Sequence, residues 1–227
     1  MISLIIPFYN EEDNVDPVLS EIRTILPDAE IVAIDDGSMD GTNAALQSRI
    51  RSHADIVLIE FERNRGKGFA VHEGLLRAKN ESCVLVDGDG QYDPADILPL
   101  ASRLAEADLV CGSRVDRKDA RNARVVSRIA NAIRRMVLHD GIRDSACGLK
   151  AIRRSVAVRH LFPFEGLHRF IPAIFHHADL AIVEVPIKHR PRLHGVTKYT
   201  HFGRAKRGIV DLFRVKMLLK KVTLAKA

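Results

Sequence analysis

The chain has 227 residues, which suits one large domain or one domain with an appendage. Its apolar fraction of 46% is typical of a globular protein with a buried core, and no run approaches the roughly 18 apolar residues of a membrane span. The first residues lack a basic n-region and a small-residue cleavage site, so we expect no signal peptide. Three scattered cysteines without a CxxC pair argue against a disulfide framework or a zinc site and favour a reducing, cytoplasmic compartment.

The net charge of +6 is unevenly distributed along the chain. Residues 1–100 carry 8 Lys and Arg against 19 Asp and Glu, a net charge of −11, whereas residues 101–227 carry 27 against 10, a net charge of +17. A basic second half predicts contact with an anionic partner. Nucleic acid, a phospholipid surface and a phosphorylated substrate are the candidates.

Short apolar runs alternate with helical patterns over the first hundred residues. Strands are predicted at 3–8, 29–35, 55–61, 82–87 and 108–114, and helices at 15–26, 41–52, 68–79 and 94–105. Strands that are apolar on both faces and separated by helices indicate an α/β fold, with a mostly parallel central sheet and helices on both of its faces. Ligands of such sheets bind beyond the carboxyl ends of the strands.

The pattern changes after residue 120. Apolar positions from Val126 to Val137 predict an amphipathic helix flanked by basic residues. Two more strands are predicted at 147–154 and 180–187, with a helix or a tight turn between them at 167–178. A long basic loop is predicted at 186–203. Without a repeat or a low-complexity linker, we predict a domain over 1–202 and a basic amphipathic helix or tail over 203–227.

Polar side chains follow each predicted strand of the first half. Because the carboxyl ends of parallel strands share one edge of a sheet, we expect these side chains to gather in one crevice. They are Glu11, Asp35, Asp36, Lys67, Asp87, Asp89 and Arg114.

The segment DGDGQYDP is the clearest candidate for a metal site. In an extended segment, alternate residues point the same way, so Asp87, Asp89 and Gln91 are expected to present oxygens to one side. Mg²⁺ and Mn²⁺ take oxygen ligands, often one or two carboxylates together with substrate phosphates. The alternative is an acidic turn with Asp93 as N-cap of a helix and Pro94 at its first position. That alternative accounts for Asp93 but not for the two aspartates after an apolar strand.

The segment DDGSMDGT fits a turn and a helix start, but Asp35 and Asp36 at the end of a strand could also accept hydrogen bonds from a ribose or a base. The chain contains neither GxGxxG nor GxxxxGK[ST], which disfavours a Rossmann dinucleotide site and a P-loop.

Six segments occur in the order and spacing of family-2 glycosyltransferases: IPFYNEEDN, DDGSMDGT, RNRGKGFAVHEG, DGDGQYDP, GSR and RLHGVTKY. Within that family the chain most resembles polyprenyl-phosphate sugar synthases of the dolichyl-phosphate mannose synthase type, over nearly all of residues 2–200. The resemblance implies a GT-A type nucleotide-diphospho-sugar transferase fold, a nucleotide-sugar donor, a divalent cation (Mg²⁺ or Mn²⁺) and a polyprenyl phosphate acceptor. Because the chain has no Trp, a QxxRW segment is impossible, which argues against the processive synthases of cellulose-like polymers.

The resemblance also implies roles for matching residues. The donor nucleotide would be bound by Pro7, Tyr9, Glu11, Ile34, Asp36, Lys67 and Asp87, with Gly68 in the adjoining Gly-rich turn. The metal would be held by Asp87, Asp89 and Gln91. The acceptor phosphate would be bound by Arg114, Arg124, Ser127, Arg128, Arg192 and Lys198, with Gly195 and Thr197 in the last basic segment. Catalysis would rest on Asp89, Arg114 and Lys198.

This assignment agrees with the chemistry of the reaction. Negative charge grows on the leaving diphosphate, and a divalent ion with nearby Lys and Arg stabilises it. A phosphate monoester has a second pKa of about 6 and is largely dianionic at neutral pH, so it needs no strong general base. In-line displacement would invert the anomeric centre. We hypothesise that Asp89 acts through the metal.

The segment DSACGLKAIRR departs from the family pattern D-x-x-S-G-F-R-x-x-R-R at Cys147, Leu149 and Lys150. Asp144 is retained, and it is interpreted either as a carboxylate that orients basic groups on the acceptor side or as a strand-entry carboxylate. His168 is interpreted either as a base or as a packed, structural histidine.

The tail from Gly203 to Lys221 is basic and partly amphipathic. Its apolar side would contain Ile209, Leu212, Phe213 and Met217, and Arg207, Arg214 and Lys221 recur on another side. This pattern predicts a helix on an anionic lipid surface, at the cytoplasmic face of a membrane. The alternative is a helix packed on the core or on another subunit of a homo-oligomer.

The sequence thus favours a metal-dependent inverting glycosyltransferase that moves a sugar from GDP-mannose or a UDP-hexose to dolichyl or undecaprenyl phosphate. One alternative acceptor is a saccharide or lipid-linked saccharide of the cell envelope, which would require a general base. A nucleic-acid-binding module is disfavoured by the aromatic content of 5%, the absence of a known motif and the acidic first half. A donor-binding protein without catalysis is the remaining alternative.

Overall fold

A computed structural model describes residues 1–52, 55–115, 132–195 and 211–219. The strands are β1 (Ile2–Phe8), β2 (Glu30–Asp35), β3 (Ile56–Glu60), β4 (Ser82–Leu85), β5 (Leu109–Arg114), β6 (Lys150–Arg153) and β7 (Ile182–Ile187). They form one seven-stranded sheet in the order β3-β2-β1-β4-β6-β5-β7. Each strand coincides with a strand predicted from the sequence.

The sheet is parallel except at β6. β1 pairs in parallel with β2 and β4, β2 with β3, and β5 with β7, whereas β6 lies antiparallel between β4 and β5. The mostly parallel sheet is therefore confirmed, and the sequence had not indicated the direction of β6. Because β6 runs backwards, its first residue, Lys150, enters the sheet at the edge where the parallel strands end.

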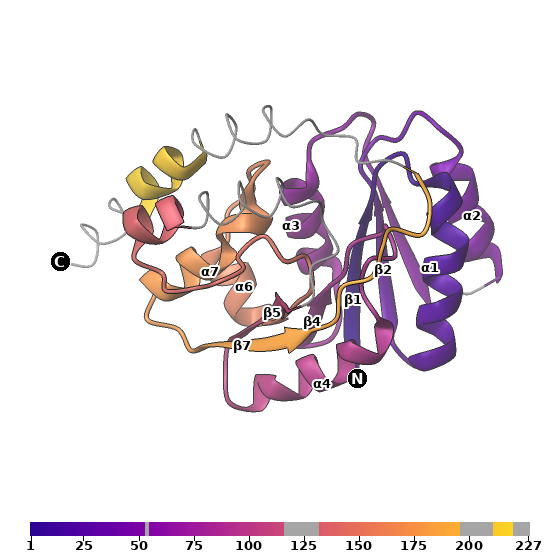
Figure 1. Ribbon diagram of the computed structural model, residues 1–227. Coiled ribbons are helices and arrows are strands. Elements are labelled where there is room, and N and C mark those ends of the chain that lie inside the picture. The colour runs from indigo at the N-terminus through magenta and orange to yellow at the C-terminus, as the bar shows by residue number, and fades with distance from the viewer. Residues whose placement is uncertain (53–54, 116–131, 196–210, 220–227) are drawn as a thin grey trace.

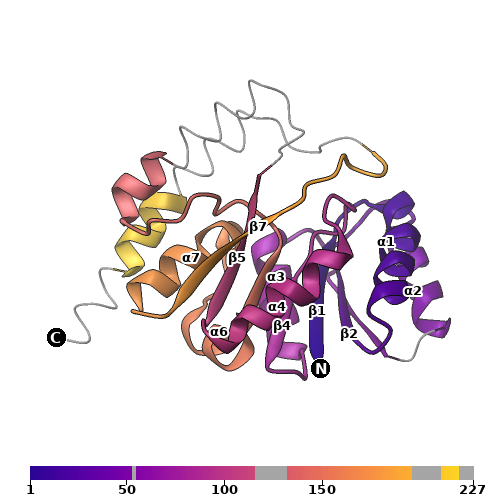
Figure 2. The ribbon, with the colours of Figure 1, turned by 60° about the horizontal axis from the view of Figure 1, so that its bottom comes forward.

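Helices cover both faces of the sheet, as predicted (Figures 1 and 2). They are α1 (Glu12–Ile25), α2 (Thr42–Ser52), α3 (Lys67–Arg77), α4 (Ile97–Ser102), α6 (Arg154–His160) and α7 (Leu167–His177), with short 3₁₀ turns η1 (Pro94–Asp96) and η2 (Arg103–Ala105) around α4. Residues 132–138 and 211–219 are also helical.

Two apolar clusters form the core, one on each face. Alternation along β1 supplies both, because Leu4 and Ile6 pack beneath α1 and α4 while Ile5 packs beneath α3. Burial on both faces explains why the central strands β1 and β2 are apolar over most of their length.

The described part of the tail packs on the core. Leu212, Val215 and Leu219 are buried in the same cluster as α7, and Phe213 and Met217 are 59% and 63% exposed. The predicted apolar side is therefore divided, because Leu212 faces inward while Phe213 and Met217 face solvent. The predicted boundary at 202/203 lies outside the described residues. Among the described helices, none is long and apolar enough to cross a membrane.

Candidate active site

Among the residues that the structure describes, most of the predicted site residues lie near the ends of the parallel strands. Asp87 and Asp89 follow strand β4, which ends at Leu85. The backbone N–H of the next residue, Val86, still donates a hydrogen bond to the carbonyl of Ile5 in β1 (3.0 Å). The predicted extended alternation is wrong beyond this point, because Gly88 and Asp89 form a turn. The turn needs a glycine at position 90, whose φ is +71°.

Three nearby cations keep the carboxylate of Asp87 ionised. Its carboxylate forms an ion pair with Lys67 at the start of α3 and is 25% exposed. Burial opposes ionisation, but the positive charges of Lys67, Lys150 and Arg114 outweigh it and lower the pKa of Asp87. This carboxylate therefore remains an anion across the physiological pH range.

Asp89 lies in a different electrostatic environment. Burial and the negative charge of Asp87 raise its pKa to about 6, while Arg192 acts in the opposite direction. One carboxylate oxygen accepts a hydrogen bond from the backbone N–H of Gln91 (3.2 Å). Two carboxylates close enough to repel each other form a site that attracts a cation.

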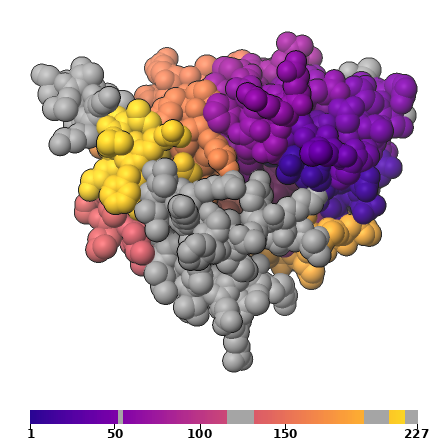
Figure 3. Space-filling view, turned by 90° about the horizontal axis from the view of Figure 1, so that it is seen from above, coloured from indigo at the N-terminus to yellow at the C-terminus, as the bar shows by residue number. Residues whose placement is uncertain are grey.

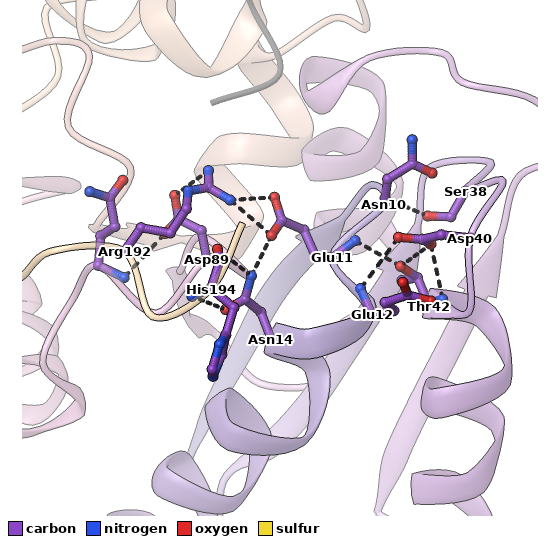
Figure 4. A network of polar contacts seen from close by, with 11 residues as sticks. Asn10, Glu11, Glu12, Asn14, Ser38, Asp40, Thr42, Asp89, Arg192 and His194 are labelled. Carbon is purple, nitrogen blue, oxygen red and sulfur yellow. Dashed lines mark hydrogen bonds and ion pairs between the residues drawn. The ribbon is translucent and has the colours of Figure 1, made fainter. Parts of the chain in front are cut away.

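Arg192 bridges Asp89 and Glu11 (Figure 4). Its Nη1 donates to both oxygens of Glu11 (2.7 and 2.8 Å), and its Nη2 donates to Oδ2 of Asp89 (3.1 Å). The Nδ2 group of Asn14 in α1 donates a further hydrogen bond to Glu11 (2.6 Å). Residues predicted separately for donor, metal and acceptor thus form one network.

The carboxylates of Asp87 and Asp89 could hold a hard divalent cation, with phosphate oxygens and water as its remaining ligands. Of the three predicted ligands, Asp87 and Asp89 come together, whereas the side-chain amide of Gln91 donates to the carbonyl of Arg190 (3.5 Å). Within the described residues no cluster of three or more His, Cys, Asp or Glu is arranged to hold a metal. Two carboxylates are the usual protein share of a Mg²⁺ site that a substrate phosphate shares.

Arg114 and Asp144 form a buried, two-pronged ion pair on the side of β5. Nε and Nη2 of Arg114 donate to the two carboxylate oxygens of Asp144 at 2.7 and 2.9 Å, and each side chain is 10% exposed. Burial works against the charged guanidinium, but Asp144 outweighs it and raises the pKa of Arg114. Asp144 therefore orients a predicted acceptor-side cation, which was one of its two interpretations.

Lys150 is a site-supporting residue that the sequence did not assign. It is 1% exposed at the start of β6, and its ammonium donates to the carbonyl oxygens of Ser145 (3.1 Å) and Cys147. These bonds shape a turn in which Gly148 lies against Asp87, since a Cβ there would be 2.2 Å from Oδ1. The available signal was a lysine at the start of a predicted strand, directly before the apolar pair Ala151 and Ile152.

The residues predicted to bind the nucleoside differ in their exposure to solvent. Pro7 and Tyr9 are half-buried near the end of β1. Ile34, which pairs with Pro7 in the sheet, is 0% exposed in the cluster beneath α3. Its predicted contact with the nucleoside is corrected, because Ile34 presents no exposed atom to a ligand.

Asp36 is engaged within the protein. Its carboxylate accepts hydrogen bonds from the backbone N–H groups of Arg65 (2.7 Å) and Gly66 (2.9 Å) and from the side chain of Asn64 (3.1 Å). Burial raises its pKa in spite of these donors. In this structure Asp36 fixes the turn that precedes α3 and Lys67.

Asp36→Ala is expected to lower the free energy of unfolding by about 2–3 kcal/mol, because backbone N–H groups at a buried position lose their acceptor. Urea unfolding measures the change. Asp28→Ala, at an exposed position, is the control and should stay within about 0.5 kcal/mol of the parent. An Asp36→Ala protein of unchanged stability that no longer binds nucleotide would show that the carboxylate serves the ligand instead.

Five residues of the predicted acceptor segments, Arg124, Ser127, Arg128, Thr197 and Lys198, lie outside the described residues. The predicted helix cap is confirmed, since the side chain of Asp93 accepts from the backbone N–H of Ala95 (3.0 Å) and Pro94 begins η1. Asp93 is thereby separated from the two aspartates of the site.

Residues 3–161 match the sequence family described as Glycosyl transferase family 2. A dodecaprenyl-phosphate galacturonate synthase of Rhizobium johnstonii is 31% identical over 229 residues, which cover 96% of this chain and 67% of the relative. An undecaprenyl-phosphate 4-deoxy-4-formamido-L-arabinose transferase of Edwardsiella ictaluri is 31% identical over 210 residues, covering 87% and 62%. The chain thus spans about two thirds or less of the length of these relatives.

Solved structures agree with the fold. Glucosyl-3-phosphoglycerate synthase of Mycobacterium tuberculosis, in complex with phosphoglyceric acid, matches with a TM-score of 0.73 at 22% identity, covering 95% of this chain and 79% of that one. The same enzyme with Mn²⁺, UDP-glucose and phosphoglyceric acid matches with a TM-score of 0.71 at 20% identity, with the same two coverages. The GT-A type fold is therefore confirmed, and the chain belongs to glycosyl transferase family 2, among relatives that are polyprenyl-phosphate sugar transferases.

Proposed function

We propose that this glycosyltransferase moves a sugar from a nucleotide-diphosphate sugar to polyprenyl phosphate, with a divalent cation and with inversion at the anomeric carbon. The observation that carries the proposal is the pair Asp87 and Asp89 at the strand edge, with Lys67, Arg114 and Arg192 around it. The named relatives support the acceptor, since both carry a polyprenyl phosphate in their names. GDP-mannose and UDP-hexoses remain the predicted donors.

The side chains divide the work between two anions. Asp87 and Asp89 would hold the cation, which when bound neutralises charge on the leaving diphosphate. Lys67 lies at the start of α3 beside Asp87, where an ammonium can bind a diphosphate oxygen. Arg114, oriented by Asp144, would bind the acceptor phosphate. Holding two mutually repelling anions together is the main requirement of this reaction.

The pairing of Asp144 with Arg114 removes one carboxylate from the candidates for the general base that a saccharide acceptor would need. A hydroxyl nucleophile needs a general base within hydrogen-bond reach. Asp144 is committed to Arg114 through two charge-assisted hydrogen bonds, so it is a poor proton acceptor.

The test is a donor screen. GDP- and UDP-sugars are incubated with Mg²⁺ or Mn²⁺ and a short polyprenyl phosphate, and the product is read by mass spectrometry. We expect one nucleotide to give a polyprenyl-phosphate sugar, and EDTA to abolish it. Transfer that survives EDTA would contradict the metal requirement, and transfer only to a free saccharide would contradict the acceptor.

We also propose that helices 132–138 and 211–219 carry the contact with the membrane, where the acceptor would reside. The two helices lie side by side in Figures 1 and 3. Apolar side chains project from both, with exposed fractions of 69% for Met136, 59% for Phe213 and 63% for Met217. Arg135 and Arg214 are exposed beside them. Apolar groups bordered by cations suit an anionic lipid surface.

The double change Phe213→Ser and Met217→Ser is expected to weaken vesicle binding by about tenfold or more, because two apolar side chains no longer enter the lipid. Co-sedimentation with phosphatidylcholine vesicles containing phosphatidylglycerol measures it. Leu98→Ser removes an apolar side chain that is 50% exposed on α4 and should leave binding unchanged. Equal loss in both proteins would contradict this surface.

A further inference from the structure

The strap formed by residues 188–195 places a cation on the candidate metal site. It follows β7 and is anchored by Arg190, which forms a bidentate ion pair with Glu21 (2.7 and 2.9 Å) and donates to the carbonyl of Tyr92 (2.7 Å). Leu193 covers Gly90, where a Cβ would lie 2.4 Å from Cδ1 of Leu193. The strap is therefore packed on the turn that carries Asp89.

The far end of the strap is fixed to α1. The backbone of His194 exchanges two hydrogen bonds with the side chain of Asn14, at 3.1 and 3.2 Å. Between the two anchors, Arg192 is only 20% exposed. Its guanidinium is held at Asp89 by the fold around it, unlike a surface side chain that samples many positions.

The charges at this position compete with a metal ion. Asp87 is paired with Lys67, and Asp89 and Glu11 share Arg192. A divalent cation that approaches Asp89 meets a guanidinium within 3.1 Å of the same carboxylate, so the two cations repel each other. The metal gains the full attraction of Asp89 only when Arg192 moves to another anion.

We propose that Arg192 is a resident counter-ion which weakens metal binding at Asp89 until the diphosphate of the nucleotide donor draws it away. The inference rests on the proposed use of a nucleotide donor. The diphosphate supplies both the anion that attracts Arg192 and oxygens for the cation. Metal and nucleotide then bind cooperatively, and by linkage each strengthens the other by the same factor. Arg192 is in this respect a positioning residue that couples the binding of the metal to the binding of the nucleotide.

Mn²⁺ alone gives the direct test, read from the paramagnetic resonance signal of the free ion. Arg192→Gln is expected to bind Mn²⁺ about tenfold more tightly than the parent, because the competing cation is gone. Lys188→Gln removes one positive charge from the same strap at an exposed position at its Asp96 end and should change Mn²⁺ affinity less than about twofold. A folded Arg192→Gln protein that binds Mn²⁺ no more tightly than the parent overturns the proposal.

Arg192→Lys covers the case in which the glutamine variant does not fold, as judged by circular dichroism. A lysine cannot bridge Glu11 and Asp89 with a planar fork, so Mn²⁺ affinity should rise about threefold. Unchanged or lower affinity in this variant overturns the proposal equally.

Calorimetric titrations with UDP and with GDP, each with and without Mn²⁺, measure the coupling. The factor by which Mn²⁺ tightens nucleotide binding should be about tenfold smaller in Arg192→Gln than in the parent. An equal factor in both proteins overturns the coupling through Arg192. If neither nucleotide binds the parent protein, the proposed function fails, while the arm with Mn²⁺ alone still decides whether Arg192 competes with the metal.

Discussion

Asp89→Asn is expected to slow sugar transfer by about a thousandfold and to leave the protein folded. The amide keeps the shape of the side chain but loses the charge that the cation requires. Stability should change by less than about 1 kcal/mol, because the loss of repulsion from Asp87 offsets the loss of the ion pair with Arg192. Initial rates with the donor found in the screen, together with urea unfolding, measure both quantities.

Asp93→Asn is the matched control for this prediction. It makes the same chemical change four residues further along, at the N-cap of η1, where asparagine caps as well as aspartate. Activity within about twofold of the parent is expected, since a surface change away from the site has little effect. Full activity of Asp89→Asn, or equal loss in both variants, would contradict the metal role of Asp89.

The architecture was accessible from the sequence because its signals are local. Runs such as 29–35 and 55–61 are apolar on both faces, and this alone predicts buried parallel strands between helices. The end of each strand then locates the edge of the sheet, so the neighbourhood of Asp87 and Asp89 followed from topology before any contact was known.

The features that the sequence did not predict depend on contacts between residues far apart in the chain. The direction of β6 is set by pairing with β4 and β5, and no local pattern specifies it. The role of Lys150 depends on that direction, because only a reversed strand brings its ammonium to the ligand edge. The inward side of Ile34 is likewise decided by the helix that packs on it. The sequence of the tail suggested that its apolar residues lie on one side, but contacts with the core bury Leu212 and leave Phe213 and Met217 exposed.

The pairing of Arg192 could not be read from sequence for a related reason. The resemblance assigned Glu11, Asp89 and Arg192 to three different ligands. The structure shows that Arg192 pairs with both carboxylates, so the three side chains are also partners of one another. Residues that bind opposite charges on a substrate are complementary to each other, so Arg192 offsets part of the negative charge of Glu11 and Asp89.

Substitutions in the ion pair between Arg114 and Asp144 are expected to have a large effect on stability. Arg114→Met is expected to lower the free energy of unfolding by about 3 kcal/mol, because the Asp144 carboxylate, 10% exposed, loses the positive charge of the guanidinium. Asp144→Leu should cost a similar amount for the opposite reason. Combining the two changes should recover most of the loss, since an apolar pair of similar size needs no desolvation of charge. Urea unfolding of the two single variants and the double variant completes the cycle.

Activity separates the structural from the chemical role of the same pair. If Arg114 binds the acceptor phosphate, the double variant is stable again but still transfers sugar about a hundredfold more slowly, because the cation at the acceptor side is absent. The loss should be reflected in the KM for polyprenyl phosphate more than in the KM for the donor. A double variant that regains both stability and transfer would show that Arg114 serves only the fold, and the acceptor phosphate would then have to be held by other cations of the basic second half. The cycle can separate the two roles because of one geometric fact: Asp144 uses both oxygens to fix the orientation of Arg114 at the end of β5.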